Sequence, residues 1–283
     1  YCSSSPVNSD RSWSAESWSI FTEWVLAWSV CEHGCVNGAE VYPRMGCRRI
    51  TCIAPCLKIP CRPSYKQDYP DSAEDLTRLL QNMNLAADDG RLNLAGVLLF
   101  AEQPEWIVPQ FVVKAIRYPG NELHPSAYLD TEDFAGVLPG VFDNALAFIM
   151  RNLHKVQAGR GVNAPGIPEI PETVFEELLV NALVHRDYLV SAPVRLFIYD
   201  NRIEIISPGH LPNNLTVEKM CTGNSNIRNP ILVSYAAKGL LPYHGLGSGI
   251  KRALAAWPDI AFQDDREGCL FTATVYRSSE YSP

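Results

Sequence analysis

The chain has 283 residues, of which 47% are hydrophobic and 19% are charged, and its formal net charge is −7. This length and composition are typical of a globular protein with room for two cores, and they exclude a chain that is disordered throughout. Because residues 1–66 carry seven Lys and Arg against five Asp and Glu, the acidic excess lies in residues 67–283, where it argues against broad affinity for a nucleic-acid backbone.

The first segment, residues 1–66, holds seven of the nine cysteines and four of the six tryptophans. Its cysteines offer enough ligands for zinc, but no C-x2-C pair occurs among them, and this spacing disfavours a zinc site. The apolar run at 24–31 follows Glu16 and Glu23 instead of basic residues, which disfavours a signal peptide. No run reaches the roughly 18 apolar residues of a membrane span. We therefore expect a poorly ordered or atypical leader on a cytoplasmic protein that has no membrane partner.

Residues 67–165 are expected to form a smaller α/β connecting domain. Ser72, followed by acidic residues in the first turn, predicts the cap of the helix that follows. Two apolar runs, LNLAGVLLF at 92–100 and QFVVKAIRY at 110–118, predict buried strands. The apolar spacing of 141–156 predicts an amphipathic helix.

A Gly- and Pro-rich linker at 159–171 leads to the C-terminal domain, which is expected over 166–283. After a helix that contains EELLVNALV, two runs rich in β-branched and aromatic residues predict a hairpin over 194–212. The remaining expected elements are a polar loop at 221–230, a helix over 231–241, a helix beginning near Gly249 and a strand within 267–277.

One polar pair on the first helix of this domain indicates a site. Glu177 and Asn181 are four residues apart, so their side chains project from the same helix face. A carboxylate and a carboxamide in this arrangement can prepare a water molecule and hold a metal-bound triphosphate. The alternative is an ordinary solvated face, which any polar helix produces. The functional interpretation gains from Gly245, Gly247 and Gly249, because glycine-rich turns at helix N-termini bind phosphates.

The order of the motifs resembles a known nucleotide-binding fold. The motifs are, in chain order, LNLAGVLLFAEQPEWIVPQF, EELLVNALVHRDY, DNRIEIISPGHLP, SNIRNP and HGLGSGI. Together they resemble the proteins labelled RecG-like, or Schlafen AlbA-domain transcriptional regulators, whose C-terminal domain has the GHKL fold of gyrase B and the histidine kinases. The resemblance implies a Bergerat-type α/β sandwich over 166–283, with ATP and Mg²⁺ as cofactors.

The resemblance also implies roles for the matching residues. Glu177 would be the general base, Asn181 the Mg²⁺ ligand and Gly209 part of the adenine pocket, while the three glycines of the last motif would form the phosphate loop. Ser207 stands where ATP-hydrolysing members carry an aspartate that accepts a hydrogen bond from adenine, and an uncharged hydroxyl bonds more weakly. We also expect Arg228 to reach the phosphates from a loop over the pocket, with a surface ion pair as the alternative.

The sequence leaves two function classes open. No G-x-x-x-x-G-K-[ST] sequence occurs in the chain, so the RecG label does not indicate a P-loop helicase motor. In the first class, the C-terminal domain binds ATP, hydrolyses it slowly with Mg²⁺ and signals to a regulatory or DNA-binding module. In the second, it is a degenerate, non-hydrolysing scaffold for interaction or dimerisation in transcriptional control. The family's AlbA-type module is not recognisable in residues 1–66, so DNA is expected to bind through a module missing or unrecognised here, and a homodimer is a further expectation.

Overall fold

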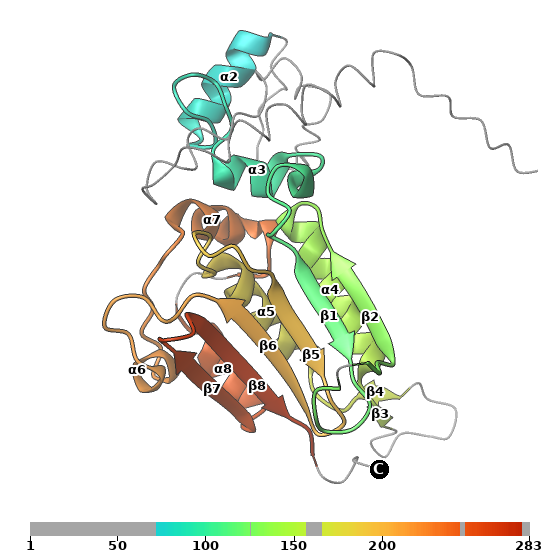
Figure 1. Cartoon of the computed structure of the whole chain (residues 1–283). Coiled ribbons are helices and arrows are strands. Elements are labelled where there is room, and N and C mark those ends of the chain that lie inside the picture. The colour runs from blue at the N-terminus through green and yellow to red at the C-terminus, as the bar shows by residue number, and fades with distance from the viewer. Residues whose placement is uncertain (1–71, 125, 157–165, 244–246, 279–283) are drawn as a thin grey trace, which may run out of the picture. The chain divides into compact units, whose positions relative to one another are not determined.

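The computed structural model describes these parts of the chain (Figure 1): residues 72–124, 126–156, 166–243 and 247–278. All of them lie within one compact unit that begins at Gly46. The leader expected over residues 1–66, most of the linker expected at 159–171, and Gly245 lie outside the described residues. What the sequence predicts for them stays a prediction.

The fold is built on one mixed sheet of six strands in the order β2-β1-β5-β6-β8-β7. β1 and β5 pair in parallel, and the other neighbours in this sheet pair antiparallel. The presence of helices beside this mixed sheet confirms the predicted α+β fold class. The strands are β1 (Val113–Arg117), β2 (Asp130–Phe134), β5 (Val194–Ile198), β6 (Arg202–Pro208), β7 (Ile260–Asp265) and β8 (Leu270–Tyr276).

Three helices, α4 (Leu138–Asn152), α5 (Glu172–Val184) and α8 (Gly249–Ala256), cover one face of this sheet (Figure 1). Nine of the 13 residues of α5 are buried, and a helix that is apolar on nearly all sides belongs in a core. α5 accordingly packs against α4, α8 and β6. The helix that carries the predicted polar pair is therefore held by neighbours on several sides. No helix in the described part of the chain is long and apolar enough to cross a membrane.

Several local predictions are confirmed. The Ser72 hydroxyl accepts a hydrogen bond from the Asp75 amide at 3.0 Å and caps the first described helix. β5 and β6 form the expected hairpin, α8 begins at Gly249, and β8 lies within the expected range. The remaining elements are α2 (Ala73–Asn82), α3 (Leu94–Phe100), η2 (Pro104–Trp106), β3 (Lys155–Val156), β4 (Ile167–Pro168), α6 (Val217–Cys221), α7 (Pro230–Tyr235) and η3 (Ala236–Leu240).

The prediction of a strand at 92–100 is wrong, because this run forms helix α3. The Asn93 side chain accepts a hydrogen bond from the Gly96 amide at 2.9 Å and so caps the helix. Six of the seven helical residues are buried, and such an apolar run has no period that separates a buried strand from a buried helix. The cap at Asn93 was the signal that distinguished them.

The sheet takes strands from both sides of the domain boundary expected at residue 165. β1 pairs with β5 from Val113↔Val194 to Arg117↔Ile198. α4 packs against α5 in the layer that covers the sheet. The division into three segments stays a prediction, but the two described segments share one sheet and one helical layer.

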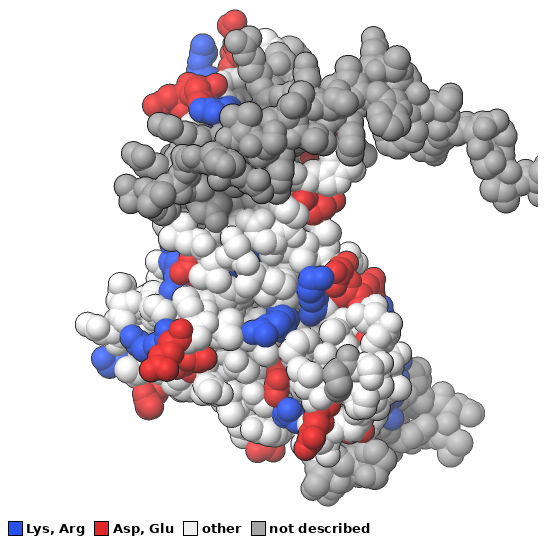
Figure 2. All heavy atoms as spheres, viewed as in Figure 1, with Lys and Arg blue, Asp and Glu red and all other residues white. Residues whose placement is uncertain are grey.

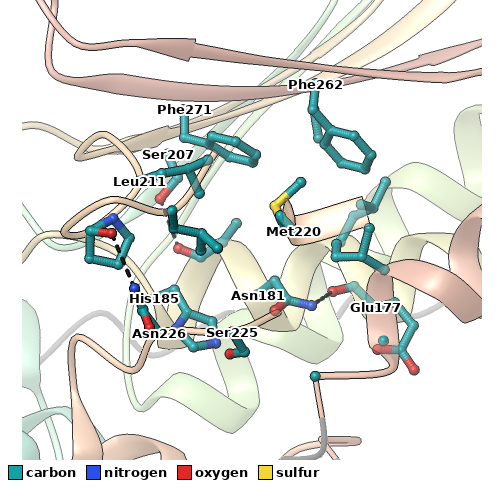
Figure 3. A pocket seen from close by; sticks show the side chains of 18 of the residues that line it. Glu177, Asn181, His185, Ser207, Leu211, Met220, Ser225, Asn226, Phe262 and Phe271 are labelled. Carbon is teal, nitrogen blue, oxygen red and sulfur yellow. Dashed lines mark hydrogen bonds between the residues drawn. The ribbon is translucent and has the colours of Figure 1, made fainter. Parts of the chain in front are cut away.

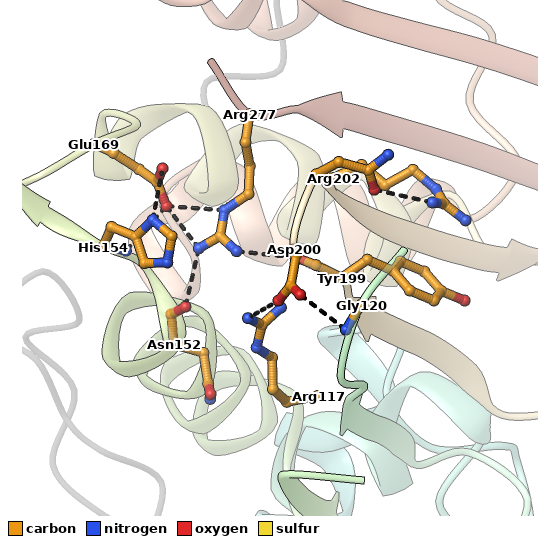
Figure 4. A network of polar contacts seen from close by, with 10 residues as sticks. Arg117, Gly120, Asn152, His154, Glu169, Tyr199, Asp200, Arg202 and Arg277 are labelled. Carbon is orange, nitrogen blue, oxygen red and sulfur yellow. Dashed lines mark hydrogen bonds and ion pairs between the residues drawn. The ribbon is translucent and has the colours of Figure 1, made fainter. Parts of the chain in front are cut away.

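A buried polar network holds the ends of several elements together (Figure 4). Arg277, directly after β8, donates from Nε to the Glu169 carboxylate at 2.9 Å, and both side chains are 1% exposed. The same guanidinium donates to the carbonyls of Tyr199 at 2.9 Å and Asn152 at 3.1 Å. One arginine thus joins the end of β8, the β5–β6 turn, the end of α4 and the segment before α5.

Candidate functional site

A pocket opens between α5, α8 and the strands β6, β7 and β8 (Figure 3). Its empty space, including the open solvent at its mouth, is about 980 Å³. Its wall has an apolar part and a polar part. The apolar part includes Leu178, Ile205, Leu211, Leu215, Met220, Ile250, Phe262 and Phe271, and the polar part includes Glu177, Asn181, His185, Ser207, Ser225, Asn226 and Arg252.

Six of the eight residues that the sequence singles out line this one pocket, although they come from separate motifs. They are Glu177, Asn181, Ser207, Gly209, Gly247 and Gly249. The seventh, Arg228, lies behind Gly209, where a Cβ added to that glycine would come within 2.5 Å of the Arg228 guanidinium. The eighth, Gly245, is outside the described residues.

Asn181 presents its oxygen to the pocket. Its Nδ2 donates to the main-chain carbonyl of Glu177 at 2.6 Å (Figure 3). Only the NH₂ end of the amide can donate to a carbonyl, so this bond fixes the orientation of the side chain. The Oδ1 atom is thereby turned away from that carbonyl and is available as a hard oxygen ligand of the kind that Mg²⁺ prefers.

The Glu177 carboxylate is buried and engaged by an arginine. Arg252 of α8 donates from Nε to Oε1 at 2.8 Å, and its Nη2 contacts the same oxygen. The Glu177 side chain is 10% exposed and that of Arg252 is 44% exposed. The sequence analysis missed Arg252, although it follows Gly249 by three residues. The two partners are 75 residues apart in sequence, so only the packing of α8 on α5 brings them together.

Gly249 allows this close approach of the two helices. A Cβ at this position would collide with the Glu177 carboxylate and lie 3.5 Å from Nδ2 of Asn181. Gly247 has a φ of +68°, and a Cβ there would lie 2.7 Å from the Gly223 carbonyl oxygen. Glycine is therefore required at Gly247 by a backbone contact and a left-handed φ, whereas a side chain at Gly249 would displace the Glu177 carboxylate.

Ser207 and Gly209 line the part of the pocket at the end of β6. The buried Ser207 hydroxyl donates to the Ala182 carbonyl of α5 at 2.9 Å, which leaves its lone pairs to accept a hydrogen bond. Gly209 follows with a φ of +106°, and a Cβ there would lie 2.5 Å from the Asp187 side chain. Ser207 thus links the end of β6 to α5, and Gly209 has no side chain that would fill the pocket.

Arg228 contacts main-chain carbonyls at the edge of the pocket. It donates to the carbonyls of His210 at 2.8 Å and His185 at 3.4 Å, and its Nε lies 3.9 Å from the Asp187 carboxylate. These contacts fix the loop that follows β6. The contact with phosphates expected for Arg228 stays a prediction. The alternative was a surface ion pair, whereas the pair with Asp187 is largely buried.

His185 is a neutral member of the pocket wall. Burial, together with a smaller effect of the positive charge of Arg228, lowers its pKa from 6.5 to about 4. Its Nε2 lies 3.0 Å from the Tyr243 hydroxyl. Burial and the nearby Glu177 carboxylate raise the pKa of Tyr243. This pair therefore adds hydrogen-bonding groups without charge near pH 7, and the sequence analysis did not foresee Tyr243.

Two aromatic rings form a flat apolar surface in the pocket. Phe262 of β7 and Phe271 of β8 stack with 6.0 Å between ring centroids and 19° between planes. Ser207 pairs with Phe271 across β6 and β8, so the hydroxyl lies beside this surface, whereas Glu177 lies at the other side of the pocket (Figure 3). The site thus combines a flat apolar end with an end that carries Asn181, Glu177 and two glycines.

Comparison with known proteins connects this region with an ATPase-type domain. Residues 191–264 match the family model described as "Putative ATP-dependent DNA helicase recG C-terminal". The match begins three residues before β5, ends within β7 and covers well under half of the chain. This part of the chain is thus similar to a RecG C-terminal-like domain of the ATPase type.

One solved structure shows the same fold. The crystal structure of the DIP2311 protein from Corynebacterium diphtheriae is similar with a TM-score of 0.58 and 19% sequence identity. The likeness covers 90% of this chain and 50% of that one, so the chain spans about half the length of the DIP2311 protein. At this identity the likeness concerns the fold alone. No curated protein matches the chain.

Proposed function

We propose that the pocket binds an adenine nucleotide together with Mg²⁺. The observation that carries this proposal is the meeting of Glu177, Asn181, Ser207, Gly247 and Gly249 around one cavity, since they come from three separate motifs. The similarity of residues 191–264 to an ATPase-type domain supports the same function. The GHKL fold implied by the motifs is part of this proposal.

The apolar end of the pocket suits a purine base. A planar ring would lie against Phe262 and Phe271, since stacking on aromatic faces is favourable for any base. The Ser207 hydroxyl donates its proton to Ala182 and would accept a hydrogen bond from the exocyclic amine of adenine. A guanine carbonyl at that position would meet an acceptor, so this arrangement favours ATP over GTP.

The polar end suits phosphates and a hydrated Mg²⁺ ion. Asn181 would hold the ion through Oδ1, which fits a metal that binds through one or two protein oxygens, phosphates and water. When bound, Mg²⁺ neutralises charge on the phosphate oxygens. Gly247 and Gly249 bring backbone close to this end without side chains in the way.

Slow hydrolysis is the activity proposed for this site, with Glu177 as the base. Its carboxylate would accept a proton from the attacking water and thereby increase the nucleophilicity of the oxygen. The non-hydrolysing scaffold remains the second candidate, and one observation favours it: the Glu177 carboxylate is bonded to Arg252. A carboxylate bound to a guanidinium has to release it before it serves as a base.

A regulatory role in transcription completes the proposal, with DNA bound through another module. On the face shown in Figure 2, basic and acidic side chains of the described residues are interspersed. Nucleic-acid surfaces instead gather Lys and Arg on one face. This face therefore lacks the clustered basic side chains of such a surface.

Titration calorimetry with ATP, ADP and GTP, each with and without Mg²⁺, tests the proposal. We expect ATP to bind more tightly than GTP, and Mg²⁺ to increase its affinity. Asn181→Ala should remove the effect of Mg²⁺, while Asn144→Ala, on the exposed face of α4, should leave it unchanged. Absence of heat with every nucleotide at millimolar concentration would contradict the proposal.

A further inference from the structure

The charged side chains of the pocket wall are paired with each other in this structure. Arg252 is the only Lys or Arg among the described residues that line the cavity, and Glu177 is the only Asp or Glu. The two are paired, with Arg252 Nε 2.8 Å from Oε1 of Glu177. A ligand with several negative charges would therefore meet no uncompensated cation in this wall while the pair is intact.

The two partners differ in their freedom to move. The Glu177 side chain is 10% exposed and lies on the central helix α5, against Gly249. The Arg252 side chain is 44% exposed, lies on α8, and donates from Nη1 to the Ser248 hydroxyl at 3.2 Å. Both Arg252 and Ser248 border the cavity. The arginine is thus the partner that can turn toward a ligand.

We propose that Arg252 is the anion-recognising residue of the pocket and that it exchanges Glu177 for the ligand's phosphates. This inference rests on the proposed nucleotide site. A guanidinium binds phosphate oxygens in a bidentate manner, so a polyphosphate competes directly with the carboxylate. When the guanidinium leaves Glu177, the carboxylate regains the lone pairs of Oε1 and can accept a proton from water. The ion pair therefore couples the arrival of phosphates to the activation of the base.

The exchange predicts opposite effects for the two partners. Arg252→Gln removes the cation, so ATP affinity should fall by about tenfold or more, while the affinity for adenosine should change by less than about twofold. Glu177→Gln removes the competitor, so ATP affinity should rise by roughly three- to tenfold, again with adenosine unchanged. In the double variant Glu177→Gln/Arg252→Gln the gain should disappear, because the released arginine is its cause.

Calorimetric titration of the full chain and these variants with ATP, adenosine and inorganic tripolyphosphate is the test. Lys251→Gln is the matched control: it removes one positive charge from the same helix, but Lys251 lies against Gly223 and does not line the cavity. Thermal melting verifies that each variant is folded. If Arg252→Gln fails to fold, Arg252→Lys keeps the charge without the bidentate geometry and should give a smaller loss of ATP affinity.

The outcomes separate this inference from the proposed function. If ATP binds but Arg252→Gln weakens ATP and adenosine equally, or Glu177→Gln gives no gain, the exchange is wrong and the nucleotide site stands. If tripolyphosphate binds in an Arg252-dependent manner while ATP and adenosine give no heat, the exchange stands and the nucleotide site is wrong. If none of the three ligands binds, both are wrong.

Discussion

Gly249 is the residue on which the geometry of the site depends most directly. It lies at the start of α8, against the Glu177 carboxylate, and a Cβ would collide with that carboxylate. The Glu177 carboxylate keeps its position only while this space stays open. Only this contact disfavours a side chain at Gly249, because its backbone is not in the left-handed region, unlike that of Gly247.

Gly249→Ala is therefore expected to destabilise the protein by about 1–3 kcal/mol, as overpacking does, and to weaken ATP binding. Gly140→Ala on α4 is the control, because no atom lies within 4 Å of a Cβ added there. That change should be neutral or stabilise the protein by up to about 1 kcal/mol. Urea unfolding measures both, and equal stability of the two variants would contradict the contact.

His185 makes stability depend on pH in a defined window. Its pKa is about 4 in the folded protein and 6.5 when unperturbed, so between these values the unfolded chain binds the proton and the folded chain does not. The free energy of unfolding therefore decreases as the pH falls from 6.5 to 4, by up to roughly 3 kcal/mol from this residue. His185→Gln should make the free energy of unfolding fall less over that window. Urea unfolding at several pH values tests this, and parallel curves for the two proteins would show that His185 does not contribute.

At the scale of elements, the Arg277–Glu169 pair is the contact that joins most segments. Both side chains are 1% exposed, so removal of either one leaves the other charge buried without its partner. Glu169→Gln or Arg277→Met should each destabilise the protein by about 3–5 kcal/mol, and the double change should cost less than the sum.

The exposed pair Lys114–Asp133 gives a matched comparison for this network. Its side chains are 48% and 57% exposed, so Asp133→Asn should change the free energy of unfolding by less than about 1 kcal/mol. Chemical unfolding under one condition measures the change in the free energy of unfolding for the variants of both pairs. Similar small effects would mean that the network in Figure 4 does not stabilise the junction of these elements.

The sequence predicted those elements whose signals are local. Ser72 marked a helix start, two runs rich in β-branched and aromatic residues predicted the β5–β6 hairpin, and the four-residue interval placed Glu177 and Asn181 on one helix face. The run that forms α3 was predicted to be a strand. An apolar run buried on all sides has no sequence period that distinguishes a helix from a strand. The contact between Arg252 and Glu177 could not be predicted, because it depends on how two helices that are distant in the sequence pack together.

At the scale of the whole molecule, the described residues have an extensive hydrophobic core. Its buried hydrophobic residues extend from Leu76 to Val275. We expect that deletion of residues 1–66 leaves a protein that melts cooperatively and binds ATP with unchanged affinity. Calorimetric melting and titration of the shortened chain measure this. Aggregation, or the loss of bound zinc from the full chain on chelation, would show that the leader is a structural domain.

The central claim is that one pocket between α5, α8 and the β6–β8 strands binds an adenine nucleotide. Chemical-shift mapping of the isotopically labelled chain with ATP and Mg²⁺ tests it most directly. The account predicts changes at the side-chain amide of Asn181 and the backbone amides of Gly247 and Gly249, with Gly140 unchanged, since only the first three border the cavity. Shifts confined to other surfaces, or none at millimolar ATP, would contradict it.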